Sequence, residues 1–293
     1  MKTRIISGAV MIIIAAAVIT LGMTVNPLFI TACIAFLAAV GIYELLHNAA
    51  KIESKAAIIG ACAYVVLMVF AIDGSTGARL QQVFDGTHKA YIKLTFTLAL
   101  SVIYFIYSAA VTLKNHKTFE LSHIAFLCGM PIPVAFAFSS LGVVINHEHG
   151  LYYLFMLLNF SSVCDAGAYF VGSTLGKHKL CPNISPKKSV EGAVGGVIIS
   201  VLCTAATCLI FQYWIFSSGV KIHYFAVILM SLAGAGLSIL GDLSFSLVKR
   251  GCHIKDFGNV LPGHGGLLDR FDSVIFVVPM IYFVTTMYPV VTI

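Results

Sequence analysis

Residues 223–243 read HYFAVILMSLAGAGLSILGDL, an apolar run whose only acidic residue, Asp242, stands next to its end. About 20 consecutive apolar residues are enough for one helix to cross a bilayer. Eight more apolar runs show the same character, near residues 5–25, 28–46, 57–72, 94–113, 121–144, 151–175, 190–216 and 273–291. The sequence therefore predicts an all-α integral membrane protein, a polytopic helical bundle of about nine transmembrane helices.

The composition excludes an ordinary soluble domain. Of the 293 residues, 59% are hydrophobic and only 10% are charged, so the apolar surface exceeds what one core could bury. The net charge of +6 would suit nucleic acid, but the basic residues lie in short loops beside apolar runs, where anionic lipid headgroups are nearer. We expect membrane lipids and no nucleic acid as partners. The eight cysteines, without a C-x-x-C pair, are predicted to be reduced packing residues.

The distribution of basic residues predicts the orientation of the helices. With the N-terminus in the cytoplasm and the first run retained rather than cleaved, 14 of the 18 Lys and Arg residues fall on the cytoplasmic side. We expect a multi-pass protein of the cell membrane (the inner or plasma membrane) whose active site faces the cytoplasm. The four exceptions are Arg79, Lys89, Lys93 and Lys221.

Ionisable residues are rare in the apolar runs before residue 150 and more frequent after it. We predict that residues 1–150 are a scaffold of membrane helices and that residues 151–293 carry the catalytic site, within a single integral-membrane unit. The stretch Met130-Pro131-Ile132-Pro133 predicts a kink or break, because proline removes helical hydrogen bonds. The polar segment 73–93 is compatible with a surface helix or a lid.

Asp165 lies inside an apolar run, in the stretch CDAGAY at residues 164–169. A carboxylate at the centre of a membrane helix costs about 2.5–3.5 kcal/mol on insertion scales, so it is expected to face a protein interior or a water-filled cavity and to have a partner. A purely structural role, satisfied by backbone or hydroxyl groups, is the alternative.

A basic loop, GKHKLCPNISPKKSVEG at residues 176–192, leads into the seventh span. Ser185 followed by Pro186 suits a helix N-cap with proline at the first helical position. The free amides of such a helix start, flanked by Lys187 and Lys188, predict a phosphate site. Alternatively, these lysines only follow the positive charge excess of cytoplasmic loops.

The end of the eighth span and the loop after it hold the densest group of charges. Asp242, Ser246, Lys249 and Arg250 have the spacing that places side chains on one helical face. The loop then leads to the ninth span through a second polar set, which comprises Lys255, Asp256, Pro262-Gly-His264-Gly265-Gly266, Asp269, Arg270 and Asp272.

Two carboxylates of this region are predicted to share one cation. The eighth and ninth spans run antiparallel, so Asp242 and Asp269 are expected at the same membrane boundary. Oxygen ligands without paired thiolates or histidines suit Mg²⁺, which completes its shell with water and substrate phosphates. The glycines let the backbone approach a phosphate or base closely, and His264 either donates a hydrogen bond or satisfies the loop. Nucleoside triphosphate chemistry fits this set.

The order Ser246-x2-Lys249-Arg250-x4-Lys255-Asp256-x5-Pro262-Gly-His264-Gly-Gly-x2-Asp269-Arg270-x-Asp272 resembles, at each position, the signature of the phosphatidate cytidylyltransferases, also called CDP-diacylglycerol synthases. The resemblance is close over residues 160–290 and includes Asp-x-x-Ala-Tyr, Gly-Lys and Ser-Pro-Lys-Lys-x-x-Glu-Gly elements. Ser189-Val190 stands in place of Thr-Trp, and Cys164 precedes the aspartate. Both departures concern local substrate packing.

The resemblance implies a nucleotidyltransferase of phospholipid biosynthesis, which transfers CMP from CTP to phosphatidic acid and gives CDP-diacylglycerol and pyrophosphate by in-line attack of the lipid phosphate on the α-phosphorus. It supports Asp242 and Asp269 as Mg²⁺ ligands, is compatible with a second cation such as K⁺, and implies a homodimer. The predicted catalytic residues are Asp242, Asp269, Lys249, Arg250, Lys255 and Arg270. The predicted substrate-binding residues are Asp165, Lys177, Ser185, Lys187, Lys188, Glu191, Ser246, His264, Gly265 and Gly266. Asp256 and Asp272 are left between loop orientation and direct ligation.

Two other classes of function remain open from the sequence. A CTP-dependent lipid kinase would move the γ-phosphate and release CDP, whereas cytidylyl transfer releases pyrophosphate. A transporter would use Asp165 and Asp242 as a permeation site and would consume no nucleotide, although transporter sites generally lie near the midplane between repeats.

Overall fold

The computed structural model describes residues 2–72, 89–216 and 220–292. By its contacts the chain divides into two compact units that interleave in sequence. The first unit comprises Met1–Asn146 and Cys252–Phe271, and the second comprises His147–Gly251 and Asp272–Ile293. The functional division at residue 150 stays a prediction. The segment 73–93, interpreted as a surface helix or a lid, lies mostly outside the described residues.

The described residues confirm a mostly helical fold with several candidate membrane spans. Seven helical segments there are long and apolar enough to cross a membrane: Leu28–Ala49, Lys55–Ile72, Leu94–Lys114, Leu121–Ile145, Gly150–Leu175, Val190–Ile215 and Tyr224–Gly251. Two shorter apolar helices, Ser7–Gly22 and Asp272–Met287, lie where the first and last spans are predicted. The orientation of the helices stays a prediction.

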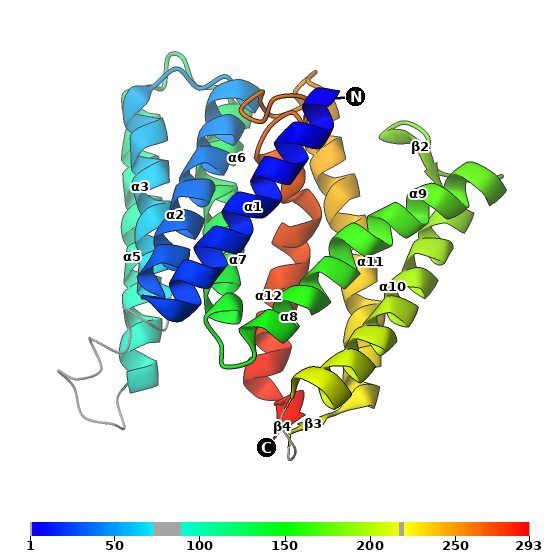
Figure 1. The fold of residues 1–293 in the computed structure, drawn as a ribbon. Coiled ribbons are helices and arrows are strands. Elements are labelled where there is room, and N and C mark those ends of the chain that lie inside the picture. The colour runs from blue at the N-terminus through cyan, green and yellow to red at the C-terminus, as the bar shows by residue number, and fades with distance from the viewer. Residues whose placement is uncertain (1, 73–88, 217–219, 293) are drawn as a thin grey trace. The chain divides into compact units, whose positions relative to one another are not determined.

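The first unit consists of helices and one long loop. In Figure 1 its helices are labelled α1 (Lys2–Thr24), α2 (Leu28–Tyr43), α3 (Lys55–Ile72), α5 (Lys89–Lys114), α6 (Leu121–Gly129) and α7 (Pro131–Ile145). Helix α3 packs against α2, α5 and α7, and α2 also packs against α1 and α7. A π-helical segment, η1 (Glu44–Ala49), extends α2, and the loop 252–271 contains the short 3-10 helix η4 (Leu268–Arg270).

The proline stretch interrupts the fifth span, as predicted. Helix α6 ends at Gly129, Met130 intervenes, and α7 begins at Pro131. A proline at the first helical position gives up no hydrogen bond, because the first backbone N–H groups of a helix have no partner within it. The chain therefore places its proline at the start of a new helix.

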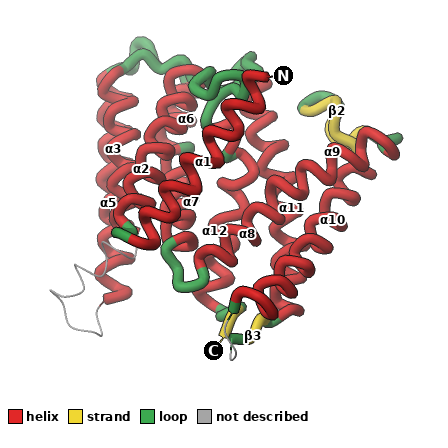
Figure 2. The backbone as a smooth tube through the Cα atoms, in the orientation of Figure 1, coloured by secondary structure: helices red, strands yellow, loops and turns green. Residues whose placement is uncertain are grey.

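The second unit is helical with two short strand pairs, drawn in yellow where they are visible in Figure 2. Its helices are α8 (Gly150–Leu158), α9 (Cys164–Leu175), α10 (Val190–Ile210), α11 (Tyr224–Gly251) and α12 (Asp272–Met287), with π-helical segments η2 (Asn159–Val163) and η3 (Phe211–Ile215). Strand β1 (Lys179–Cys181) pairs antiparallel with β2 (Ser185–Ser189), and β3 (Lys221–Ile222) with β4 (Val291–Thr292). The all-α prediction did not include these strands, which are too short for an alternating pattern to show.

Small residues let α9 and α10 approach closely. A Cβ added at Gly196 would lie 2.6 Å from the carbonyl oxygen of Cys164 and 2.9 Å from the Cβ of Ala168. One added at Gly192 would lie 2.7 Å from the carbonyl oxygen of Ala168. Spacings of four residues between small side chains are typical of close helix pairs in membranes. This contact fixes Asp165, on α9, against the helix that follows the basic loop.

We expect Gly196→Ala to lower the melting temperature of the purified protein in detergent, because overpacking costs about 1–3 kcal/mol. The matched control is Gly236→Ala on α11, where an added Cβ meets nothing within 4 Å. Both changes gain about 1 kcal/mol of helix propensity, so their difference isolates the packing. Equal melting temperatures in a thermal scan would contradict the close contact.

Candidate active site

The polar face at the end of α11 is confirmed. Asp242, Ser246 and Lys249 lie on successive turns of one helix, and the Ser246 hydroxyl donates a 3.2 Å hydrogen bond to Oδ1 of Asp242. Asp242 is about three-quarters buried, with 24% of its side chain exposed. The charged stripe of this helix is therefore partly withdrawn from solvent.

The basic loop contributes one of its two adjacent lysines to this face. Lys188 forms an ion pair with Asp242 Oδ2, and 25% of its side chain is exposed. Lys187, the preceding residue of strand β2, is exposed. Successive side chains of a strand point to opposite faces, so β2 directs Lys188 toward α11 and Lys187 away. The sequence predicted the same role for both lysines. Their successive positions on strand β2 give them different surroundings.

Asp272 and Asp165 extend the cluster from α12 and α9. Lys249 Nζ lies 3.8 Å from Oδ2 of Asp272, and both side chains are largely buried. Ser273 donates a 3.3 Å hydrogen bond to Oδ2 of Asp165, and Asp165 also interacts electrostatically with Lys188 and Asp242. The prediction that Asp165 has a partner is confirmed: a hydroxyl, as in the structural interpretation, and the charges of the cluster as well.

The charge balance of this cluster fits a cation. Three carboxylates, Asp165, Asp242 and Asp272, interact with one another and with two ammonium groups, Lys188 and Lys249. Carboxylate oxygens are the ligands that Mg²⁺ prefers. Among the described residues, no group of three or more His, Cys, Asp or Glu side chains is arranged to hold a metal ion by itself.

The loop between α9 and α10 is organised by Glu191. Its carboxylate accepts hydrogen bonds from the backbone N–H groups of Lys177, at 3.0 Å, and His178, at 3.2 Å, and its Oε1 lies 2.5 Å from Nδ1 of His178. At the end of α11, Nε of Arg250 donates to the carbonyl of Ile184, at 3.4 Å. Both contacts hold the β1–β2 hairpin against the helices.

The prediction that Ser185 caps a helix is wrong. Ser185 begins strand β2, and α10 starts at Val190 with Ser189 as its N-cap. The Ser189 hydroxyl accepts the N–H of Gly192 at 3.1 Å. The segment before Ser189 pairs with β1, from Lys179↔Ser189 to Cys181↔Ser185, and this pairing delays the helix by one turn.

In the first unit, the loop 252–271 closes around Asp269. Oδ2 of Asp269 accepts the backbone N–H groups of Phe257, at 2.8 Å, and Gly266, at 3.1 Å. Gly263 and Gly265 adopt φ of 77° and 86°, a region that L side chains rarely occupy. The predicted glycine turn is therefore a requirement of the backbone.

The other predicted residues of this loop differ in burial. Lys255, Asp256 and Arg270 are exposed, and Arg270 donates from Nη2 to the carbonyl of His264. Nδ1 of His264 is hydrogen-bonded to the Ser7 hydroxyl of α1, at 2.8 Å. The loop and the start of α1 lie side by side in Figure 1. The His264 side chain thus contacts α1 in this structure, and its predicted role at the substrate stays a prediction.

Cys252, at the start of this loop, and the seven other cysteines are free thiols. Their reduced state stays a prediction. Burial raises the pKa of the Cys252 thiol, which keeps it protonated near neutral pH.

Three residues that touch the loop were missed by sequence reasoning. Ser7, Glu44 and Asn48 belong to the predicted scaffold, yet each hydrogen-bonds to residues 257–268. For Glu44 a signal existed, because it lies in an apolar run, as Asp165 does. For Ser7 and Asn48 the sequence carries no comparable signal. Asp242 and Asp269 belong to different units, and their sharing of one cation stays a prediction.

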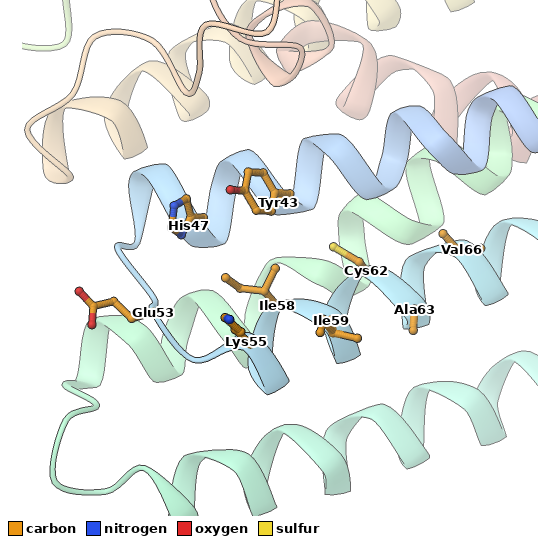
Figure 3. A pocket seen from close by; sticks show the side chains of 9 residues that line it. All are labelled: Tyr43, His47, Glu53, Lys55, Ile58, Ile59, Cys62, Ala63 and Val66. Atoms are coloured by element: carbon orange, nitrogen blue, oxygen red, sulfur yellow. The ribbon is translucent and has the colours of Figure 1, made fainter.

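The first unit also contains a cavity of about 650 Å³. Figure 3 shows its lining, with Tyr43 and His47 from the end of α2 and η1 and a series of small and apolar side chains along α3. Its lining residues are Tyr43, His47, Glu53, Lys55, Ile58, Ile59, Cys62, Ala63 and Val66, so it contains no predicted site residue.

Comparison with known proteins places the chain in a family. Residues 2–288 match the model of the cytidylyltransferase family. The chain is 34% identical over 290 residues to the phosphatidate cytidylyltransferase of Bacillus subtilis (strain 168), covering 98% of each protein. It is 33% identical over 285 residues to that of Staphylococcus saprophyticus and 30% identical over 283 residues to that of Staphylococcus haemolyticus, covering 96% of this chain and 97% of each relative. This chain therefore belongs to the cytidylyltransferase family.

Proposed function

We propose that this protein is a phosphatidate cytidylyltransferase, which transfers CMP from CTP to phosphatidic acid and gives CDP-diacylglycerol and pyrophosphate. The observation that carries the proposal is the near full-length match to relatives of that name, together with the charged cluster of the second unit. The predicted location suits the substrates, because CTP and Mg²⁺ are cytosolic whereas phosphatidic acid keeps its acyl chains in the bilayer.

The proposed metal ligands are Asp242 and Asp269, and Asp165 and Asp272 add negative charge around Asp242. When bound, Mg²⁺ would neutralise phosphate charge and orient the triphosphate. A second cation such as K⁺ stays part of the proposal. Asp269 already accepts two backbone N–H groups through Oδ2, which fixes the direction of its carboxylate.

The basic residues are proposed to bind phosphates. Lys188 and Lys249 are paired with Asp242 and Asp272 in this structure. Once these carboxylates have a cation as a partner, the ammonium groups become available to substrate. Arg250, Lys255 and Arg270 are exposed to solvent and complete the proposed phosphate-binding set, to which Lys187 and Lys177 are added as further candidates.

The attack itself needs little proton transfer from the protein. The phosphate monoester of phosphatidic acid is already anionic near neutral pH. Catalysis of phosphoryl-type transfer consists mainly of positioning and charge neutralisation. The described cluster, with the carboxylates of Asp165, Asp242 and Asp272 and the ammonium groups of Lys188 and Lys249, supplies both kinds of charge.

The test is product analysis with purified protein in detergent, phosphatidic acid, Mg²⁺ and CTP labelled in the cytidine. We expect label in the lipid and one pyrophosphate for each labelled lipid, with both lost in Asp242→Asn and in Asp269→Asn. Release of CDP with an unlabelled phosphorylated lipid would instead establish a kinase. No consumption of CTP by folded wild-type protein, with Mg²⁺, Mn²⁺ and K⁺ each tried, would contradict both enzymes and favour a transporter.

A further inference from the structure

Glu44 is a fully buried carboxylate inside a candidate membrane span, with 0% of the residue exposed. It opens the π-helical segment η1 at the end of α2. Ionised groups are rarely kept in such a place without partners, because burial in hydrocarbon or protein is costly for a charge. Single π-helical turns inside α-helices occur frequently at functional sites.

The partners of Glu44 are backbone groups of the loop 252–271. Oε1 accepts the N–H of Leu267 at 3.0 Å, and Oε2 accepts the N–H of Leu268 at 2.9 Å. Asn48, four residues further along η1, donates from Nδ2 to the carbonyl of Phe257 at 2.8 Å. Segment η1, at the end of α2, thus binds the loop at two places, at Phe257 and at Leu267 and Leu268.

Glu44 and Asp269 both accept hydrogen bonds from the backbone of the same loop. Asp269 accepts the N–H groups of Phe257 and Gly266, and Glu44 accepts those of the next two residues, Leu267 and Leu268. A Cβ added at Gly266 would lie 2.8 Å from Oε2 of Glu44 and 2.9 Å from Oδ2 of Asp269. One added at Gly258 would overlap Oε1 of Glu44. Two glycines of the loop therefore leave the room that the carboxylates occupy.

We propose that Glu44 is a positioning residue of the cytidylyltransferase reaction, which fixes the loop 257–270 and with it Asp269, Arg270 and His264 in the geometry that receives the nucleotide. This inference rests on the proposed function. Glu44 acts through the backbone amides and touches no substrate atom in this role. The proposal gives η1 and α2, in the first half of the chain, a role in the reaction.

The test compares Glu44→Gln with Glu53→Gln in the full-length protein in detergent. A glutamine keeps the size of the side chain but turns an N–H₂ donor toward one backbone N–H, so one of the two hydrogen bonds is lost. Glu53 is exposed and follows the same helical segment, which makes it the matched control. Hydrogen–deuterium exchange of peptides spanning residues 256–270 measures the restraint directly, and steady-state kinetics measures its consequence.

In Glu44→Gln we expect loss of exchange protection in residues 256–270. We also expect a fall of about 10–100-fold in kcat/KM for CTP, the usual cost when a group that orients a ligand-bearing residue is replaced. The KM for phosphatidic acid should stay close to that of wild type. A lower Vmax with unchanged KM for CTP and unchanged hydrogen–deuterium exchange would mean that Glu44 is merely a structural residue, and would overturn the proposal. Wild-type values in both the exchange and the kinetics would also overturn it.

A second variant covers failure of Glu44→Gln to fold. Gly258→Ala keeps the Glu44 side chain but adds a methyl group that would overlap its Oε1. It should displace the carboxylate and so reproduce the loss of protection and the fall in kcat/KM for CTP. Gly129→Ala, where an added Cβ meets nothing within 4 Å, is its control. If wild-type protein made no labelled lipid, the proposed function would fail; exchange would then still decide separately whether Glu44 restrains the loop.

Discussion

Asp242→Asn is expected to lower the rate of CDP-diacylglycerol formation by more than about 100-fold, because replacing a group that merely orients a metal ligand already costs about 10–100-fold. The substitution keeps the shape of the side chain and removes its charge. It leaves Lys188 without the carboxylate that it pairs with in this structure. Initial rates with labelled CTP, over a range of Mg²⁺ concentrations, measure the loss and show whether more metal restores activity.

The control for Asp242→Asn is Glu148→Gln, which removes a charge from an exposed residue outside the predicted site. Its rate should equal that of wild type. Binding of Mn²⁺ as a probe, followed by electron paramagnetic resonance, should weaken in Asp242→Asn and stay unchanged in the control. An Asp242→Asn protein that is folded, binds Mn²⁺ normally and retains activity would contradict the proposed ligand.

Lys188→Met is expected to raise the KM for CTP by about 10–100-fold, since a hydrogen bond to a charged group is worth about 1.5–3 kcal/mol. The same change should strengthen Mn²⁺ binding in the absence of nucleotide, because the ammonium group that neutralises Asp242 is gone. The two effects have opposite signs, which a general loss of structure cannot produce. Steady-state kinetics and Mn²⁺ titration measure them.

Lys179→Met, an exposed lysine on the neighbouring strand β1, is the control for this change. Lys187→Met should have a smaller effect than Lys188→Met, because Lys187 is exposed. A double-mutant cycle with Asp242→Asn should show coupling, as expected for residues in direct contact. Additive effects, or equal effects at Lys187 and Lys188, would contradict the role assigned to the Lys188–Asp242 pair.

The placement of the helices could be read from local sequence. The run predicted at residues 190–216 corresponds to Val190–Ile215 and the run at 57–72 to Lys55–Ile72, because a span needs only enough consecutive apolar residues to satisfy its backbone within the bilayer. The break at Met130 and the polar face of α11 likewise depend on residues a few positions apart. The reaction chemistry was indicated by the resemblance of the signature residues 246–272 to a known family.

Tertiary structure decided which polar residues meet. Lys188 faces Asp242 because strand pairing with β1 fixes its side of β2, and Ser189 takes the cap predicted for Ser185 for the same cause. Glu44 binds Leu267 and Leu268 across more than 200 residues of sequence. No local pattern records such a contact. The sequence by itself thus determined the membrane helices and the residue types of the site, whereas the partners of each buried charge were settled only when distant backbone amides and side chains packed together to offset the cost of burying it.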